Sequence, residues 1–424
     1  MSSGHGAFAG WLRTHVTRLD SLDPHGPLDD LEPLRELVGD ARVVAVGESA
    51  HFVSEFTCAR QRIVRFLVER CGFSAFAFEF GFSEAFGVDR WVQGEGAEAD
   101  LSRVSEAASA WGAGNLMRFL RDLSTRKGHP VRFLGIDIPE AGGSLLPALL
   151  PVADYLRDVD VEIVPLVESA IATAERFAGK SGASAAPAWA KLEPAEQDGL
   201  TAALTRLLLR FRALRPLYVE RSNPYDYDVA LHRLEAAGHA DYMLRAMTGL
   251  FAGTGLPGDL SIRDRYMAES VRWHLDHSGP GTRIVLAAHN NHIQKTPVAY
   301  GGVLTTLPMG QHLDRMLGTN YLALAVTSTA DHTPDMQLDA TSAVGFTVVD
   351  MPLEAPDPGS IEAAALDAGV HLGLADFRQA PVEAVRGLDR IRSQSAYMHT
   401  PVAEAFDGVM VIPTVTIEDV LPGE

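Results

Sequence analysis

Residues 42–51 read RVVAVGESAH, and this stretch indicates the fold class of the protein. Residues 42–46 (RVVAV) form a β-rich run that is apolar on both faces, which is typical of a buried parallel strand. Residues 53–72 follow with the apolar spacing of a helix, and SAFAFEF at 74–80 and VRFLGID at 131–137 are further β-rich runs. Strands that alternate with helices in this way predict an α/β fold with a mostly parallel sheet flanked by helices.

The same alternation returns in the last third of the chain. Residues 261–278 have the spacing of a helix, and further strands are predicted for RIVLAA at 283–288, YLALAVT at 321–327 and GVMVI at 408–412. The remaining segments of the core are predicted to be helices at 7–20 and 27–39 and irregular strands and loops at 331–360.

The middle of the chain has a different pattern, because no strand is predicted between about residues 140 and 260. Helical spacing recurs at 150–180, 193–217 and 228–250, and the small residues of 178–190 (AGKSGASAAPAWA) suggest an exposed connection. We therefore expect an inserted helical region that caps the sheet. The expected division is a first half of the α/β core at 1–140, a helical insertion at 141–260 and a second half of the core at 261–424.

Composition excludes several classes of protein. Hydrophobic residues make up 46% and charged residues 21% of the 424 residues, as in globular proteins rather than disordered or fibrous ones. The net charge of −19 disfavours binding to a nucleic-acid backbone. No apolar run approaches the roughly 18 residues that a membrane-spanning helix needs, so we expect no membrane partner.

The expected location is the cytoplasm. The N-terminal residues lack the basic start and apolar centre of a signal peptide. The two cysteines, Cys58 and Cys71, are too few for a disulfide framework, and both lie in the predicted helix at 53–72. A reducing compartment suits this pattern.

Acidic and histidine side chains stand at the ends of four predicted strands. In an open parallel sheet these carboxyl ends lie side by side, and ligands bind just beyond them. One such residue commonly caps a helix or satisfies a backbone amide, but four coincident strand ends favour a functional cluster. The residues are Glu48 and His51 after the first strand, Glu79 and Asp137 on the next two, and His289 and His292 after the fourth.

An imidazole beside a carboxylate is a common arrangement for activating water as a nucleophile. We expect His51 to be the general base, held by Glu48 or Glu79. His289 and Arg60 are expected to stabilise the oxyanion that forms when water attacks a carbonyl group.

Other catalytic templates fit less well. The chain has no G-x-S-x-G sequence, which disfavours an α/β-hydrolase serine, although Ser49 in the cluster stays a weaker candidate nucleophile. Residues 253–258 have the spacing of a dinucleotide-binding loop but follow a predicted helix and contain Pro257, which favours an ordinary loop. A divalent metal is the main alternative, because the same His and Glu residues, with His289 and His292 as a pair, are plausible ligands.

Several motifs resemble the erythromycin esterase family. They are GESAH at 47–51, FEF at 78–80, RDRYMAE at 263–269, AHNNHI at 288–293, and the weaker PMGQHLDRMLG at 308–318 and FDGVMVI at 406–412. Together they span nearly the whole chain. The resemblance implies an α/β core with a helical region over the cleft, and hydrolysis of the lactone ester of fourteen-membered macrolides.

The resemblance also implies roles for individual residues. It makes His51 the general base, with Glu48 and Glu79 in support, and it places Arg60 and His289 in the active site. A metal has been argued for some members of the family and not for others. We expect no metal and no other cofactor here.

Aromatic residues of the helical insertion suit a large hydrophobic ligand. They are Trp189, Phe211, Tyr218, Tyr225, Tyr227 and Tyr242. We expect Tyr225 and Tyr227, with His292 and Asp137, to bind the substrate. The alternative is that most of these aromatic residues form the core of the insertion.

The resulting hypothesis is a hydrolase of carboxylic esters that acts on a macrolide or another large natural product. One alternative is a biosynthetic tailoring enzyme that uses the same cluster for elimination or ring closure. The others are a metal-dependent hydrolase and a non-catalytic binding protein, although mere binding needs no such cluster.

Overall fold

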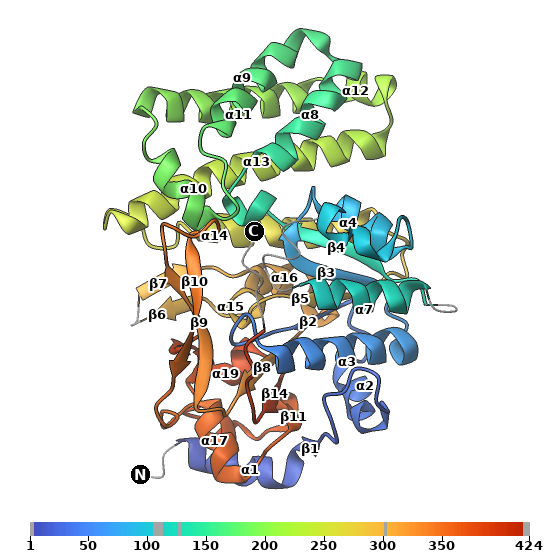
Figure 1. The fold of residues 1–424 in the computed structure, drawn as a ribbon. Coiled ribbons are helices and arrows are strands. Elements are labelled where there is room, and N and C mark those ends of the chain that lie inside the picture. Colours follow the sequence, from blue (N-terminus) through green and yellow to red (C-terminus); the bar gives the residue numbers. More distant parts are fainter. Residues whose placement is uncertain (1–3, 105–112, 126–128, 301–302, 419–424) are drawn as a thin grey trace.

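The computed structural model describes residues 4–104, 113–125, 129–300 and 303–418 and is built around one twisted sheet (Figure 1). Eight strands pair in the order β1-β11-β14-β8-β2-β5-β3-β4. The strands from β14 to β4 are parallel to one another, whereas β11 is antiparallel to both of its neighbours. The predicted mostly parallel α/β fold is confirmed. The strands are β1 Thr17–Arg18, β2 Val43–Val46, β3 Ala75–Gly81, β4 Arg132–Asp137, β5 Ile284–Ala287, β8 Tyr321–Ser328, β11 Gly373–Asp376 and β14 Gly408–Ile412.

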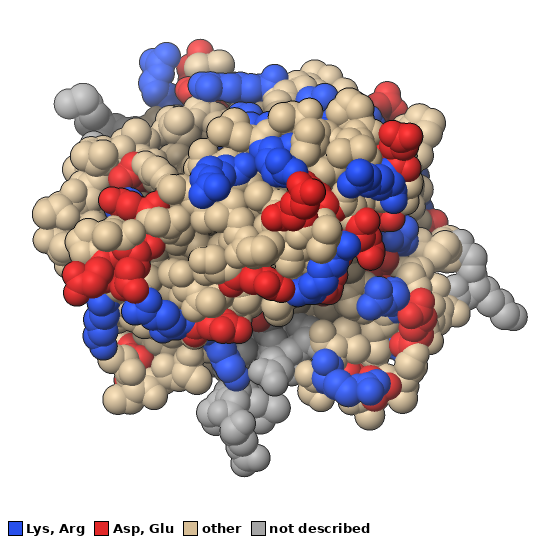
Figure 2. Space-filling model, turned by 90° about the horizontal axis from the view of Figure 1, so that it is seen from above, with Lys and Arg blue, Asp and Glu red and all other residues tan. Residues whose placement is uncertain are grey.

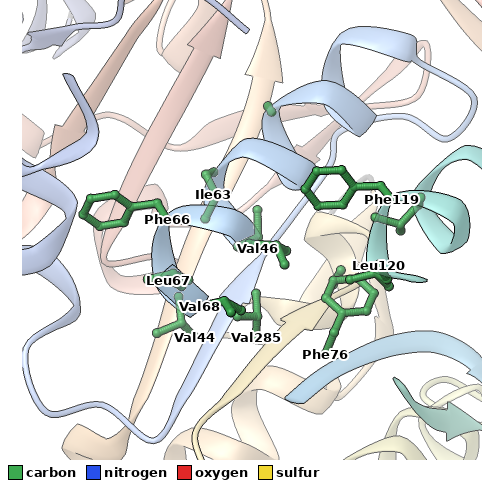
Figure 3. Packing of buried hydrophobic residues seen from close by; sticks show 14 of the residues in the cluster. Val44, Val46, Ile63, Phe66, Leu67, Val68, Phe76, Phe119, Leu120 and Val285 are labelled. Atoms are coloured by element: carbon green, nitrogen blue, oxygen red, sulfur yellow. The ribbon is translucent and has the colours of Figure 1, made fainter. Parts of the chain in front are cut away.

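Helices cover both faces of the sheet because successive strand residues point to opposite faces. Val44 and Val46 of β2 pack into one core cluster, and Val43 and Ala45 into another. Figure 3 shows Val44, Val46, Phe76 and Val285 against the first face's helices. That face carries α2 Pro33–Val38, α3 Ser54–Cys71, α4 Ala85–Val92 and α7 Gly114–Thr125. The other carries α1 Gly4–His15, α14 Ser261–Asp276, α16 Met309–Leu317, α17 Ile361–Ala368, α18 Val382–Val385 and α19 Val402–Ala405.

Residues 146–251 form a separate bundle of helices at the top of Figure 1. The bundle has its own apolar core and meets the sheet through the short helix η3, Pro139–Gly142, which follows β4 directly. This contact places the bundle at the carboxyl ends of the strands. Its helices are α8 Leu146–Val159, α9 Val164–Glu175, α10 Gly182–Trp189, α11 Pro194–Ala213, α12 Arg215–Arg221 and α13 Pro224–Phe251. The three-part division of the chain given above stays a prediction.

Three short two-stranded sheets complete the molecule. The hairpin β9–β10 rises beside the central sheet toward α10, where the hydroxyl of Ser181 donates to the carbonyl oxygen of Val344 at 2.6 Å. The other two are β6–β7 and β12–β13, and β13 contacts β6. Their bounds are β6 Val298–Tyr300, β7 Val303–Thr306, β9 His332–Leu338, β10 Phe346–Pro352, β12 Arg390–Ser393 and β13 Ala396–His399.

Two local predictions were wrong. Residues 178–190 are not an exposed connection, because α10 begins at Gly182 with a reciprocal Ser181–Ser184 cap and buries Trp189. Its small residues allow α10 to pack closely against its neighbours. The helix predicted at 7–20 ends at His15, since Thr17 and Arg18 pair with β11.

The surface of the bundle, seen from above in Figure 2, carries Lys and Arg interspersed with Asp and Glu. This face shows no broad patch of a single charge. In the described ranges, no helix combines the length and the apolar character that spanning a membrane requires.

Candidate active site

Asn290, in the turn after β5, connects this turn to the loop after β2 and to β8, and its backbone amide donates to the carbonyl oxygen of Glu48 at 2.8 Å. The side-chain amide of Asn290 donates to the carbonyl oxygen of Val326 at 2.9 Å and accepts the amide of the same residue at 3.2 Å, as a peptide group would. A Cβ atom at Gly47 would lie 1.9 Å from Asn290 Oδ1, so only glycine leaves room for this contact. The adjoining side chains of the GESAH and AHNNHI motifs are therefore held at one edge of the sheet.

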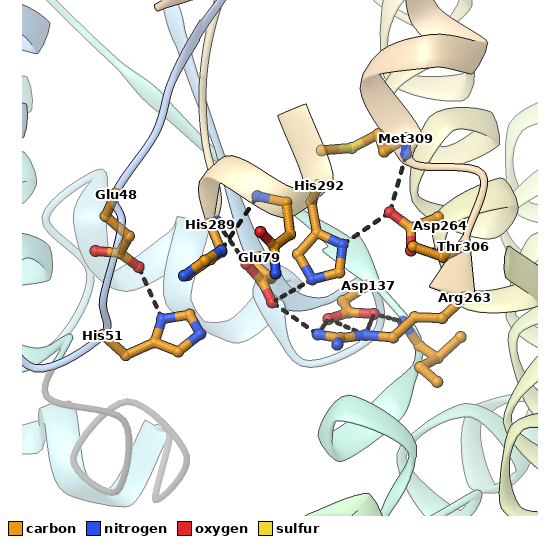
Figure 4. Close-up of polar contacts among 12 residues, drawn as sticks. Glu48, His51, Glu79, Asp137, Arg263, Asp264, His289, His292, Thr306 and Met309 are labelled. Atoms are coloured by element: carbon orange, nitrogen blue, oxygen red, sulfur yellow. Dashed lines mark hydrogen bonds and ion pairs between the residues drawn. The ribbon is translucent and has the colours of Figure 1, made fainter. Parts of the chain in front are cut away.

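His51 is held in position by Glu48. His51 Nδ1 lies 2.8 Å from Glu48 Oε1 (Figure 4). Arg60 Nη2 lies 2.8 Å from the other carboxylate oxygen of Glu48. Burial alone would raise the pKa of Glu48, but the charge of Arg60 and the hydrogen bond from His51 outweigh it and lower the pKa to about 2. Glu48 is thus ionised and accepts the Nδ1 proton, which leaves Nε2 of a neutral His51 as the basic nitrogen.

The pKa of His51 is raised above its ordinary value. Burial lowers it, but the hydrogen bond and charge of Glu48 outweigh that effect. Because the base must be unprotonated, we expect kcat/KM to rise with pH through a midpoint above about 6.5. Glu48→Gln removes the charge and should move this midpoint to lower pH, which a pH–rate profile measures. An unchanged midpoint in Glu48→Gln would show that His51 does not set the acid limb.

Glu79 lies at the centre of a second network. Its Oε1 is 2.8 Å from Arg263 Nη2 and 3.4 Å from His292 Nε2, and its Oε2 accepts the backbone amide of His289 at 3.0 Å (Figure 4). Burial would raise the pKa of Glu79, but the charges of His292 and Arg263 hold it well below its ordinary value. Arg263 also binds both carboxylate oxygens of Asp137, which is fully buried.

His292 is a cation at neutral pH. Its Nδ1 lies 2.7 Å from Asp264 Oδ1, so the ring sits between the carboxylates of Asp264 and Glu79. Burial lowers the pKa of His292, but these two carboxylates outweigh it and raise the pKa to about 10. The amide of Met309 and the hydroxyl of Thr306 also donate to Asp264 and hold its carboxylate in place.

His289 was expected to stabilise the oxyanion, but both of its ring nitrogens are bonded to backbone groups. Its Nδ1 accepts the backbone amide of Asn291 at 3.1 Å, so its Nε2 carries the proton and donates to the carbonyl oxygen of Ser49 at 3.1 Å. Burial lowers the pKa of His289 to about 3, and the ring is neutral. The two ring nitrogens are occupied by backbone groups, so this residue supports the GESAH loop, and its ring centroid lies 5.0 Å from that of His51.

The charges of the two networks around Glu48 and Glu79 nearly cancel. Their carboxylates outnumber their cations by one while His51 is neutral, and the two balance when His51 takes a proton. The carboxylates of these networks therefore stabilise the protonated form of His51. The carboxylates are Glu48, Glu79, Asp137 and Asp264, and the cations are Arg60, Arg263 and His292.

Two pockets meet at His51, Glu79 and Arg263. A wide pocket of about 630 Å³ extends from these residues to Met243 and Met247 of α13 and to the hairpin β9–β10. A narrow pocket of about 80 Å³ runs the other way, past Arg60, and is walled by phenylalanines of β3. Since α10 and α13 line the same pocket as His51 and His289, the helical bundle covers the strand ends.

The aromatic residues predicted to bind substrate lie elsewhere. Tyr227 is buried in the core of the bundle and donates its hydroxyl to the carbonyl oxygen of Phe211 at 3.1 Å. Tyr225 is 48% exposed and packs near Trp273. Both stand roughly 25 Å along α13 from Met243, at a rise of about 1.5 Å per residue, and neither lines the two pockets. Tyr227 belongs to the apolar core of the bundle, whereas Met243 and Met247 of the same helix line the cleft.

Asp137 was expected to bind the substrate, but its carboxylate accepts hydrogen bonds from Arg263 and from the backbone amide of Ile138. Its role is therefore structural. Arg263 and Asp264 themselves were not predicted as site residues, although both lie in the quoted RDRYMAE motif. A further unpredicted group is Glu84 in the narrow pocket, where burial raises the pKa to about 7 and the carboxylate accepts the amide of Glu140.

The side chains named above as alternative metal ligands are bonded to other groups of the site. In the part of the chain that the structure describes, no three His, Cys, Asp or Glu side chains are arranged to hold an ion. Glu79 and His292 instead face Arg263 and Asp264, which satisfy them as ion pairs.

Comparison with known proteins agrees with the sequence motifs. A family model described as erythromycin esterase matches residues 68–415. Erythromycin esterase type II of Escherichia coli is 34% identical over 98% of this chain and 99% of its own length, and type I of the same organism is 34% identical over 91% and 93%.

Solved structures show the same relationship. A mutant of erythromycin esterase EreC in its open conformation superposes with a TM-score of 0.89 at 33% identity, over 97% of this chain and 99% of that one. A protein from Bacillus cereus shares the fold with a TM-score of 0.77 at 20% identity, over 98% and 99% of the two chains. The chain belongs to the erythromycin esterase family.

Proposed function

We propose that this protein hydrolyses an ester or lactone bond with water activated by His51. The observation that carries the proposal is the chain Arg60–Glu48–His51, with 2.8 Å at each link, which ends where both pockets meet. Such a chain orients the imidazole, fixes its tautomer and stabilises the cation formed on proton transfer. His51 is the catalytic base, Glu48 and Arg60 position it, and further charged groups surround the reacting carbonyl.

The reaction proceeds by two proton transfers. Nε2 of His51 takes a proton from water while the water oxygen attacks the carbonyl carbon, and the carbonyl π electrons move to oxygen. Arg263 and His292 line the wide pocket while bonded to Glu79, Asp137 and Asp264, and their positive charges stabilise this oxyanion at a distance. The intermediate then breaks its bond to the ester oxygen, which receives the proton held by His51, giving a carboxylic acid and an alcohol.

The proposed substrate is a macrolide or another large natural product. The two Escherichia coli relatives named above are erythromycin esterases, and the wide pocket offers about 630 Å³ with Met243, Met247 and Phe346 among its walls. A pocket of this volume, with apolar walls and a few polar groups, is typical of sites that bind drug-sized ligands. A cytoplasmic location fits the two cysteines, neither of which forms a disulfide.

Hydrolysis in ¹⁸O-labelled water tests the reaction class. Mass spectrometry of the product should show the addition of one water molecule, with the label in the new carboxylate. A product of unchanged mass, or one that has lost water, would instead establish ring closure or elimination by the same cluster.

A chelator experiment tests the metal alternative. We expect exhaustive treatment with EDTA to leave kcat/KM unchanged and elemental analysis to find far less than one divalent ion per chain. The reason is that the carboxylates of the cluster already face Arg60, Arg263 and His292. Loss of activity with EDTA, restored by a divalent ion, would favour the metal-dependent mechanism.

A further inference from the structure

Gln394 occupies an unusual position in the tight turn between β12 and β13. Ser393 pairs with Ala396 across this hairpin, so Gln394 is the first of the two residues at its tip. Its φ is +54°, a conformation that glycine normally adopts at this place in a two-residue turn. Strained backbone of this kind is found most often at functional sites, where the surroundings hold it in place. The side chain that glycine would lack is therefore a candidate for a function.

Two hydrogen bonds join Gln394 to the loop that carries His51. The backbone amide of Gln394 donates to the carbonyl oxygen of Ser49 at 2.7 Å. The side-chain oxygen of Gln394 accepts the backbone amide of His51 at 3.1 Å. Because a backbone amide can only donate, the atom that faces it must be the oxygen, and the NH2 group points another way. The contact with His51 thus fixes the orientation of the side-chain amide.

The NH2 group of Gln394 has a hydrogen-bonding capacity that the described residues do not use. Gln394 lines the wide pocket together with His51 and His289. Its Nε2 is buried and makes no hydrogen bond to any residue that the structure describes. A buried donor without a partner is costly, and native proteins keep few of them. We expect a group of the substrate to be the partner of this donor.

The groups considered above for the oxyanion are bonded to other partners. Both ring nitrogens of His289 bond to backbone groups. Arg60 pairs with a carboxylate and lines the narrow pocket. Arg263 and His292 pair with carboxylates as well, and they act on the oxyanion through their charge. A neutral donor that bonds the oxyanion directly would complement these charges, and Gln394 offers one.

We propose that the side-chain NH2 group of Gln394 donates a hydrogen bond to the carbonyl oxygen of the ester as water attacks and this oxygen becomes negatively charged. This inference rests on the proposed ester hydrolysis and adds a catalytic residue to it. The hydrogen bond is stronger to the oxyanion than to the neutral carbonyl group, so it lowers the barrier more than it tightens substrate binding. The bond between Gln394 and the backbone of His51 keeps the donor and the base together.

Two synthetic esters provide the test. They are the 4-nitrophenyl ester of an arylalkanoic acid and its thiono analogue, in which sulfur replaces the carbonyl oxygen. Sulfur is a weak hydrogen-bond acceptor, so the thiono ester gains little from a donor at this position. The preference between the esters is the ratio of their kcat/KM values, measured from the release of 4-nitrophenolate. We expect the protein to prefer the oxygen ester about tenfold or more beyond the preference of hydroxide ion for the same pair.

Three variants separate the donor from other effects of the side chain. Gln394→Met keeps the length but removes the NH2 group, so kcat for the oxygen ester should fall about a hundredfold and the preference should drop to that of hydroxide. Gln394→Glu retains an oxygen for the backbone amide of His51, lacks the NH2 group, and should lose the preference as well. The matched control is Gln379→Met, at an exposed residue outside both pockets, which should leave both rates within about twofold.

Two results would overturn the assignment of the donor. One is a preference in the unsubstituted protein no larger than that of hydroxide, and this comparison needs no substitution, so a folding defect cannot hide it. The other is a preference that survives in folded Gln394→Met, because a residue that only positions His51 would slow both esters equally. Hydrolysis of the oxygen ester, and its loss in His51→Asn, judge the proposed function separately, since the preference does not depend on which residue activates the water.

Discussion

Replacing His51 with asparagine is expected to lower kcat by about a hundredfold or more. General-base catalysis typically contributes about 10²–10⁴ to a rate, and asparagine has no basic nitrogen to accept the proton of water. Steady-state hydrolysis of an ester substrate measures the loss, and circular dichroism verifies that the fold is retained.

The control for this experiment is a histidine outside the pockets. His371 is exposed, and His371→Asn should leave kcat within about twofold. A folded His51→Asn protein with nearly normal kcat would exclude His51 as the base and turn attention to Ser49 in the same loop.

Replacing Arg263 with glutamine is expected to destabilise the fold by about 3–5 kcal/mol, the usual consequence of removing one partner of a buried ion pair. Arg263 neutralises both Glu79 and the fully buried Asp137, and glutamine would leave these charges in a poorly solvated site. Urea denaturation monitored by fluorescence measures the free energy of unfolding.

A matched variant lies two residues away on the same helix. Arg265 pairs with Glu269 at the surface, and Arg265→Gln should cost at most about 1 kcal/mol. The double variant Arg263→Gln/Asp137→Asn should regain part of the lost stability, because it removes the uncompensated carboxylate. If Arg263→Gln alone were no worse than Arg265→Gln, the ion-pair network would not be the main support of this site.

The central strands were predictable because burial on both faces imposes an almost uniformly apolar sequence. β2, β5 and β8 each lie within one residue of the predicted bounds. β1 and β11 were not predicted, because β1 has two residues and β11 four, and their strand conformation comes from pairing with each other and with β14.

Part of the candidate site was predictable as well, because the apolar pattern shows where each central strand ends. Parallel strands bring their carboxyl ends together, so Glu48, His51, Glu79 and His289 were expected to be neighbours, and the structure places them so. The aromatic residues of the insertion misled the prediction, because an amphipathic pattern does not tell which face of a helix meets the bundle core and which meets the cleft. Tyr227 faces the core, although it was expected to bind substrate.

The sequence alone shows which side chains stand at the strand ends, because each strand ends where its apolar run stops. Their charge states and partners follow from contacts made only in the folded protein. Arg263 and Glu79 are 184 residues apart in the chain, and the occupation of both His289 nitrogens by backbone groups depends on two loops that meet in space. Electrostatic and hydrogen-bond energies depend on distance and burial, so the folded geometry made His292 a cation and His289 neutral.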